Sequence, residues 1–324
     1  MEKNEVQAAL KEFAKEFGAG VVSMLGSSPI NEVARFSTGI ISLDHALGGG
    51  IPRGRIVEIY GPESSGKTTL CTHFIGLLQK QGERCAFVDM EHAFDPIYAQ
   101  HLGVVTDDLL FTQPDSGEQC LQIIEKLLEL ELGVIVVDSI AAMTPIAEIQ
   151  GEYGAAVMGS QARMLGQGMR KLTAKISKSK TTVIFTNQIR QKIGVVWGSP
   201  EVTTGGNAIK FYASVRMDIR RIAKLEKGTG EAKSVIGNTI KVKVIKNKTH
   251  TPYKEAKFDL MFETGISVFG DILESAIREG IVERAGAMYR YKGDTIGKGR
   301  EATQQYLKDN PEVTEEIKNE MQYK

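Results

Sequence analysis

Residues 61–68 read Gly-Pro-Glu-Ser-Ser-Gly-Lys-Thr and follow the apolar-rich run at residues 55–60. They match the phosphate-binding loop pattern GxxxxGK[ST], which connects a strand to a helix. The glycines let backbone N–H groups turn inward around a polyphosphate, and a helix beginning near Gly66 adds the positive end of its dipole. An ordinary glycine-rich turn is the alternative, but the flanking strand and helix argue against it. The segment predicts an α/β fold that binds a nucleoside triphosphate.

The predicted ligand is ATP with Mg²⁺. Lys67 would reach the β- and γ-phosphates, and the Thr68 hydroxyl would ligate Mg²⁺. Asp138 ends the apolar run at residues 134–137, and at that edge of an open α/β sheet its carboxylate would contact Mg²⁺ through water. A helix N-cap is the alternative role for Asp138. The loop residues predicted to bind the nucleotide are Gly61, Pro62, Glu63, Ser64, Ser65, Gly66, Lys67, Thr68 and Thr69.

Two more strand ends carry candidates for the hydrolytic chemistry. Glu91 closes the run at residues 86–90, and a carboxylate beside the γ-phosphate can polarise the attacking water. Spacing alone leaves Asp89 as a competitor for that role. Gln188 follows the run at residues 183–187, where a neutral amide can touch the γ-phosphate and respond to its loss. The pattern alone does not separate this role from that of an ordinary polar residue.

Composition and charge set looser limits. The chain has 324 residues, enough for one large domain and a small one, and its 40 basic and 40 acidic residues cancel. Any binding to nucleic acid must therefore come from local patches. The three cysteines lack CxxC spacing, the amino terminus has no apolar signal core, and no apolar run is long enough to span a membrane. These features predict a cytoplasmic protein that does not bind membranes.

The chain divides into three predicted parts. Residues 1–33 hold an amphipathic helical pattern, in which Val6, Leu10, Phe13 and Phe17 recur at helical spacing. Residues 34–266 alternate strand-like and helical runs, which predicts a sheet flanked by helices. Residues 267–324 change to helix, short strands and helix, which predicts a small α/β domain. The predicted strands are residues 55–60, 85–89, 109–113, 134–138, 182–186, 215–219 and 240–245.

Two glycine-rich stretches are too long for ordinary connections in a compact enzyme. They lie at residues 148–162 and roughly 189–210, and loops of this length are usually functional or disordered. The second stretch contains Arg190, the only tryptophan, Trp197, and the pair Gly205-Gly206. Backbone amides, cations and an apolar wedge suit sequence-neutral binding of single strands. A disordered surface loop is the alternative.

Lysines alternate with apolar residues along residues 241–248, Lys-Val-Lys-Val-Ile-Lys-Asn-Lys. In a strand this order places Lys241 and Lys243 on one face. The alternation changes at Ile245, so Lys246 and Lys248 are expected to address something different. An edge strand protected by lysines is the alternative.

Many segments of the sequence together resemble the RecA recombinases, from about residue 10 to the end. Several of them are specific to that family and are not shared by other phosphate-loop proteins. The matching segments are residues 37–39, 43–44, 46–48, 55–70, 91–93, 95–98, 187–190, 210–216, 246–248, 291–293 and 307–311.

The resemblance implies roles for residues of the nucleotide site and of its boundary with a neighbouring subunit. Glu91, not Asp89, would be the general base, and Gln188 would couple the γ-phosphate to the second loop. Asp95 and Tyr98 would contact adenine. Lys246 and Lys248 would cross the boundary to a neighbouring subunit and contact its ATP. Phe211 would lie at the same boundary, and the N-terminal helix would pack on the adjacent subunit.

The resemblance also implies that residues 148–162 and 189–206 form two DNA-binding loops, and that the chain has two DNA paths. Lys241 and Lys243 would belong to a secondary path, and the C-terminal domain would bind duplex DNA. The residues expected near the primary single strand are Met158, Arg163, Arg190, Ile193, Trp197, Gly205 and Gly206.

A RecA recombinase is a DNA-dependent ATPase that forms helical filaments on single-stranded DNA and catalyses homologous pairing and strand exchange. The resemblance therefore implies these activities, with an SOS-type repressor and single-strand-binding or loader proteins as further partners. A RecA-core helicase or switch ATPase is the alternative, and a non-catalytic, ATP-gated DNA coat is another.

The sequence departs from the family pattern in four places. Trp197 stands where a phenylalanine is usual, and Phe262 stands where a tyrosine near adenine is common. Residues 224–239 form a longer segment than usual, near a region tied to repressor cleavage. The carboxyl end carries only a mildly acidic stretch.

Overall fold

The computed structural model describes residues 3–19, 21–24, 33–152, 159–192, 194, 198–228 and 233–321. Two compact units divide the chain, Met1–Ala34 and Arg35–Lys324. The first contains helix α1 (Lys3–Phe17), whose Phe13 and Phe17 rings lie 6.3 Å apart and are both exposed. This confirms the predicted helix. In the described residues, no helix is long and apolar enough to cross a membrane.

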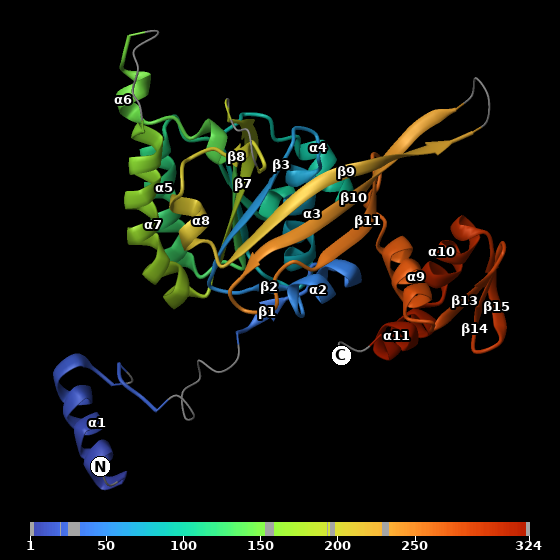
Figure 1. The fold of residues 1–324 in the computed structure, drawn as a ribbon, viewed down its shortest axis with the longest axis horizontal. Helices are drawn as coiled ribbons and strands as arrows, with labels where there is room; N and C mark the ends of the chain where they lie inside the picture. Colours follow the sequence, from blue (N-terminus) through green and yellow to red (C-terminus); the bar gives the residue numbers. More distant parts are fainter. Residues whose placement is uncertain are drawn as a thin grey trace. The chain divides into compact units, whose positions relative to one another are not determined.

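A large sheet with helices packed against it forms the centre of the second unit (Figure 1). Among the described residues it has ten strands, in the order β12-β11-β10-β9-β3-β7-β6-β4-β5, and β8 pairs with β7. The six strands from β9 to β5 in this order run parallel, and β10, β11 and β12 add antiparallel pairs. The predicted fold class is confirmed.

The strands and helices of this unit follow one another along the chain. The strands of the sheet are β3 (Ile56–Gly61), β4 (Cys85–Asp89), β5 (Leu109–Thr112), β6 (Val134–Asp138), β7 (Thr182–Gln191), β8 (Glu201–Thr203), β9 (Val215–Lys227), β10 (Ser234–Asn247), β11 (Glu255–Met261) and β12 (Gly265–Ile266). A separate short pair joins β1 (Arg35–Phe36) and β2 (Ile51–Pro52). The helices before the C-terminal region are α2 (Ile41–Leu47), α3 (Lys67–Lys80), α4 (Pro96–His101), α5 (Gly117–Leu127), α6 (Ile146–Ile149), α7 (Ser160–Ser179) and α8 (Ala208–Tyr212).

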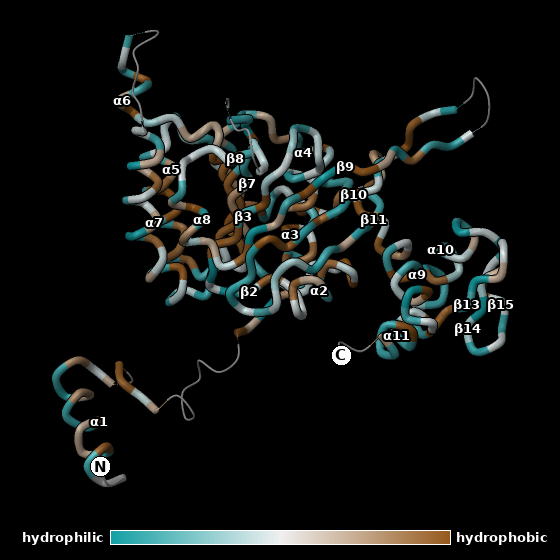
Figure 2. The backbone as a smooth tube through the Cα atoms, viewed as in Figure 1, coloured by the Kyte–Doolittle hydropathy of each residue, from teal (hydrophilic) through white to brown (hydrophobic). Residues whose placement is uncertain are grey.

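The central strands are buried on both faces, as expected for parallel strands covered by helices. Successive side chains point to opposite faces, so two hydrophobic clusters form. One joins Val57 and Phe87 to Phe74 of α3, and the other joins Val137 and Phe185 to helices α5 and α7. Figure 2 shows the hydrophobic residues concentrated along these strands.

The C-terminal region has its own hydrophobic cluster. This region consists of a three-stranded antiparallel sheet, β13-β14-β15, with three helices. Its elements are α9 (Val268–Arg278), β13 (Val282–Ala285), β14 (Met288–Tyr291), β15 (Asp294–Lys298), α10 (Arg300–Asp309) and α11 (Pro311–Glu320). Asn310 separates α10 from α11, and Pro311 begins α11, where its fixed φ suits the first helical position. This confirms the predicted small α/β region.

Three strands are longer than the sequence predicted. β7 continues five residues beyond Thr186 because Ile189–Gln191 pair with β8. β9 and β10 form one long hairpin, paired from Val215↔Asn247 out to Lys227↔Ser234, and it extends past the end of β11 (Figure 1). The longer segment at residues 224–239 therefore lies in the arms of this hairpin, where the structure describes it.

Candidate functional site

The phosphate loop connects β3 to α3, as predicted. Gly66 is the N-cap of α3 with φ +92°, a left-handed conformation that disfavours other residues. A Cβ atom there would also lie 2.9 Å from the Leu260 side chain. The loop therefore needs glycine at this position to aim the first N–H groups of α3 into the pocket.

Lys67 lies against the loop that it follows in sequence. Its Nζ donates hydrogen bonds to the carbonyl oxygens of Gly61, at 3.2 Å, and Pro62, at 2.8 Å. Burial lowers the pKa of this ammonium, and the nearby Asp138 and Glu91 carboxylates oppose that shift. The cation is thus held within the loop, where a polyphosphate could replace the two carbonyls as its partner.

Asp138 lies at the end of β6 and is almost fully buried. Its Oδ2 accepts a hydrogen bond of 2.5 Å from the Thr68 hydroxyl, and its Oδ1 accepts one from the Thr186 hydroxyl. Burial raises the pKa of this carboxyl, and the two hydroxyl donors oppose the rise. The carboxylate therefore faces the loop and caps no helix, which makes the N-cap alternative wrong.

Thr68 and Asp138 form an oxygen pair of the kind that Mg²⁺ prefers. In the part of the chain that the structure describes, no group of three or more His, Cys, Asp or Glu side chains is placed to hold a metal ion. A Mg²⁺ ion ligated by Thr68, with Asp138 acting through water, would take its other ligands from phosphate oxygens and water.

Glu91 and Asp89 have different surroundings. Asp89 is buried, and its two oxygens accept hydrogen bonds from the backbone of Glu91 and Phe94 and from the Gln113 side chain, at 3.0–3.1 Å. The Glu91 side chain is exposed, and its Oε1 accepts hydrogen bonds from Ser139 Oγ and, at 3.0 Å, from Gln188 Nε2. Asp89 thus shapes the turn after β4, while Glu91 faces the pocket.

A single pocket brings these predicted residues together. It is lined by loop residues 63–69, Glu91, Asp138 and Gln188. The strand register explains the arrangement, because Gly61 lies opposite Gln188 and Asp89 lies opposite Asp138. Three strand ends therefore place their polar residues around the phosphate loop, at the carboxyl edge of the sheet.

The two predicted adenine contacts lie on α4, outside the set of residues that line this pocket. Asp95 is the N-cap of α4, and its Oδ1 accepts hydrogen bonds from the backbone N–H groups of Ile97, at 2.9 Å, and Tyr98, at 3.0 Å. The Tyr98 side chain is half-buried and Phe262 is exposed. Contact of Asp95 and Tyr98 with a base remains a prediction.

The two predicted DNA-binding stretches meet at their bases. Gly205 and Gly206 have φ values of +81° and +71°, and a Cβ on Gly206 would lie 2.8 Å from that of Ala162 on α7. Arg163, in the first turn of α7, is exposed, as is Arg190 on β7. Met158, Ile193 and Trp197 lie outside the described residues.

The lysine-rich segment lies on β10, an inner strand between β9 and β11. Lys241 and Lys243 share one face, and both approach Glu255 on β11, at 3.0 and 3.8 Å. The edge-strand alternative is therefore wrong. The predicted change of alternation is confirmed, because a register shift separates Val244 from Lys246.

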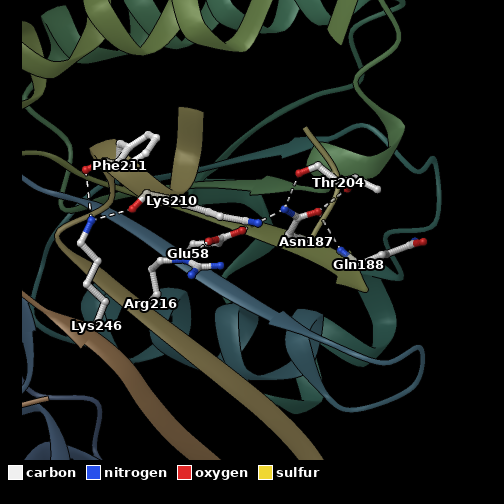
Figure 3. Close-up of polar contacts among 8 residues, drawn as sticks. All are labelled: Glu58, Asn187, Gln188, Thr204, Lys210, Phe211, Arg216 and Lys246. Atoms are coloured by element: carbon white, nitrogen blue, oxygen red, sulfur yellow. Dashed lines mark hydrogen bonds and ion pairs between the residues drawn. The ribbon is translucent and has the colours of Figure 1, made fainter. Parts of the chain in front are cut away.

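Lys246 and Lys248 instead lie at the C-terminal end of α8. Lys246 Nζ donates to the carbonyl oxygens of Lys210, at 2.6 Å, and Phe211, at 3.1 Å (Figure 3). Lys248 Nζ also donates to Phe211 O, at 3.1 Å. The Phe211 side chain is 70% exposed beside them. Lys246, Lys248 and the exposed Phe211 ring thus form one surface at the C-terminal end of α8, named here the α8 cation surface.

Sequence reasoning missed several polar residues that contact the predicted ones. Ser139 and Thr186 hold Glu91 and Asp138, while Asn187 contacts Glu58 and Thr204. Ser139, Thr186 and Asn187 lie near the carboxyl ends of buried strands, which is the signal that could have identified them. Glu58 lies within β3, a buried strand, and gives no such signal.

Comparison with known proteins agrees with this geometry. A model of the RecA N-terminal domain matches residues 4–267, and a model of the RecA C-terminal domain matches residues 270–324. Protein RecA of Brucella anthropi is 54% identical over 315 residues, which cover 96% of this chain and 86% of that protein. Protein RecA of Brucella canis and that of Brucella suis are each 53% identical with the same coverage. The chain therefore belongs to the RecA family of recombinases.

Proposed function

We propose that the chain is a DNA-dependent ATPase that assembles into helical filaments on single-stranded DNA and drives homologous pairing and strand exchange in recombinational repair. One observation supports this most directly. Gln188 contacts Glu91 in the phosphate pocket and stands on β7, the strand that leads into the second predicted DNA-binding loop.

In the proposed hydrolysis, Lys67 and the N–H groups of the loop bind the β- and γ-phosphates, while Asp95 and Tyr98 contact adenine. Thr68 would ligate Mg²⁺ and Asp138 would hold it through water, and the charge of the ion would offset that of the phosphates. Glu91 accepts the proton of the attacking water, because its carboxylate faces the pocket and Ser139 fixes one of its oxygens.

Gln188 is the proposed link between nucleotide and DNA. Its amide donates to Glu91 in the structure, and a γ-phosphate oxygen is likewise an ionised acceptor for the same N–H group. Moving the amide to the phosphate would release Glu91 for the water and shift the start of the second loop. DNA bound by Arg163, Arg190, Gly205, Gly206 and the predicted contacts Met158, Ile193 and Trp197 would favour the same arrangement.

The remaining parts of the chain complete the proposal. Residues 1–33 pack on an adjacent subunit, residues 34–266 form the ATPase core, and residues 267–324 bind duplex DNA. Lys241 and Lys243 line a secondary DNA path. Single-strand-binding or loader proteins and an SOS-type repressor, whose self-cleavage the filament would stimulate, are the proposed further partners.

The test of this proposal is ATP turnover with and without circular single-stranded DNA. The proposal predicts strong stimulation by DNA and open helical filaments in electron micrographs. Closed hexameric rings would favour the helicase or switch alternative, and DNA binding with negligible turnover would favour the DNA coat.

The α8 cation surface provides a test of assembly. We propose that Lys246 and Lys248 reach the ATP of a neighbouring subunit. Lys246→Ala and Lys248→Ala should then assemble poorly on DNA and hydrolyse little ATP, although each pocket is intact. Adding a Lys67→Ala partner with intact lysines should restore turnover at mixed interfaces.

The matched control is a partner that carries Lys67→Ala together with both lysine substitutions. It should restore nothing, because neither of its surfaces can complete a site. Equal restoration by both partners, or none by either despite confirmed co-assembly, would contradict lysines that act between subunits.

Assembly should also depend on pH. Burial, followed by the charges of Lys248 and Arg216, lowers the pKa of Lys246 to about 8. Phosphate binding requires the charged form, so ATP-dependent assembly should weaken as pH rises through 8 and should take up protons near that pH. Light scattering across pH 7–9 measures assembly. Calorimetry in two buffers of different ionisation enthalpy measures the uptake of protons. Lys246→Arg should move the loss of assembly to higher pH, and an unchanged profile in that variant would assign the titration to another group.

A further inference from the structure

Glu58 is a buried carboxylate in the middle of the central sheet. It lies on β3, opposite Phe185 of β7 and Arg216 of β9, and its side chain is 0% exposed. An ionised carboxylate is costly to bury unless it is paired and hydrogen-bonded. A pair of apolar residues would often stabilise such a position as well, so stability alone does not explain the charge.

The two oxygens of Glu58 bind different neighbouring strands (Figure 3). Oε2 accepts a bond of 2.5 Å from Arg216 Nε on β9, and Oε1 accepts one of 2.9 Å from Asn187 Nδ2 on β7. The Arg216 guanidinium also lies over the Tyr60 ring, 4.7 Å from its centre. A displacement of either partner therefore acts on the same carboxylate.

The Asn187 branch leads to the phosphate pocket. Asn187 is fully buried, and its Oδ1 accepts from the Gln188 backbone N–H, at 2.9 Å, and from the Thr204 hydroxyl. Its Nδ2 also donates to Thr204 O, at 3.1 Å. Asn187 thus fixes the backbone on both sides of the second loop, and Gln188 carries the contact on to Glu91.

The Arg216 branch leads to the α8 cation surface. Arg216 is the register partner of Lys246 on β10, and Lys246 binds the carbonyl oxygens of Lys210 and Phe211. The charges of Arg216 and Glu58 act on Lys246 in opposite directions, because Arg216 lowers the pKa of Lys246 and Glu58 raises it. When Lys246 moves to another acceptor, the electrostatic balance around Arg216 changes.

We propose that Glu58 is a positioning residue that couples the α8 cation surface to the orientation of Gln188, through Arg216 on one side and Asn187 on the other. This rests on the proposed function. An interface formed at Lys246 in one subunit would thereby set the γ-phosphate sensor of the same subunit, so that neighbouring sites respond together.

Two substitutions separate this role from simple packing. Glu58→Gln breaks the ion pair and should lower both the thermal midpoint and the ATP cooperativity of DNA-stimulated turnover. Glu58→Met combined with Arg216→Met replaces the pair by apolar side chains, while Asn187 Nδ2 keeps its bond to Thr204 O. The double variant should recover the midpoint, yet its Hill coefficient should approach 1.

A milder pair of variants tests the other branch without disturbing the ion pair. Thr204→Val removes the hydroxyl that binds Asn187 Oδ1 and should lower the Hill coefficient. Thr203→Val is the matched control, because the structure gives the buried Thr203 hydroxyl no hydrogen-bond partner among the described residues. The control should keep wild-type cooperativity.

The outcomes are distinguishable from failure of the proposed function. A wild-type chain without DNA-stimulated turnover would contradict the proposed function itself. A stimulated wild type whose cooperativity survives in both the Met double variant and Thr204→Val would show that Glu58 only packs the sheet.

Discussion

Lys67→Ala is expected to abolish productive ATP binding and to reduce DNA-stimulated turnover by about 10²-fold or more, as when a preorganised donor to a developing charge is removed. Lys67 is the only cation in the loop, and in the structure its ammonium is already held against the carbonyl oxygens of Gly61 and Pro62. Turnover assays and binding of a fluorescent ATP analogue measure the two effects.

Lys80→Ala provides the control for this substitution. Lys80 is the last residue of the same helix and is exposed, so its loss should change turnover little. Near-normal DNA-stimulated hydrolysis by Lys67→Ala would show that residues 61–68 do not form the phosphate site.

Glu91→Gln is expected to keep ATP and DNA binding while turnover falls by about 10²-fold or more, as for a missing general base. Glutamine retains an acceptor oxygen for Ser139 and Gln188, so the pocket should keep its shape. Binding of a fluorescent nucleotide and of labelled single-stranded DNA, measured with the same preparation, controls for misfolding. Wild-type turnover in this variant would place the base elsewhere, with Asp89 as the next candidate despite its hydrogen bonds to the backbone of Glu91 and Phe94 and to the Gln113 side chain.

The strands that the sequence predicted best are those formed by a continuous run of apolar residues, because such a run also predicts that the strand is buried. β4 and β6 end at the predicted residues because continuous apolar runs close on Asp89 and Asp138. Polar residues directly after such runs must lie at the carboxyl edge of the sheet. The structure brings Lys67, Thr68, Glu91, Asp138 and Gln188 together around one pocket, and their roles there stay predictions.

Features that depend on a distant strand could not be predicted in this way. β7 and the β9–β10 hairpin extend beyond their apolar runs because another strand satisfies their backbone groups. β11 was not predicted, and without it the pattern of Lys241 and Lys243 fits an edge strand equally well. Glu58 gave no signal, since a charge within a short strand identifies no partner until Arg216 and Asn187 are in place.

The central claim is that ATP use at this pocket drives exchange between DNA strands. The most direct measurement is strand exchange, with circular single-stranded DNA, homologous linear duplex and ATP, followed by gel electrophoresis. We expect nicked circular duplex and displaced linear strand with the wild-type chain, and neither product with Lys67→Ala or with a heterologous duplex. ATP hydrolysis on single-stranded DNA without any exchanged product, across protein concentrations that coat the DNA, would contradict the account.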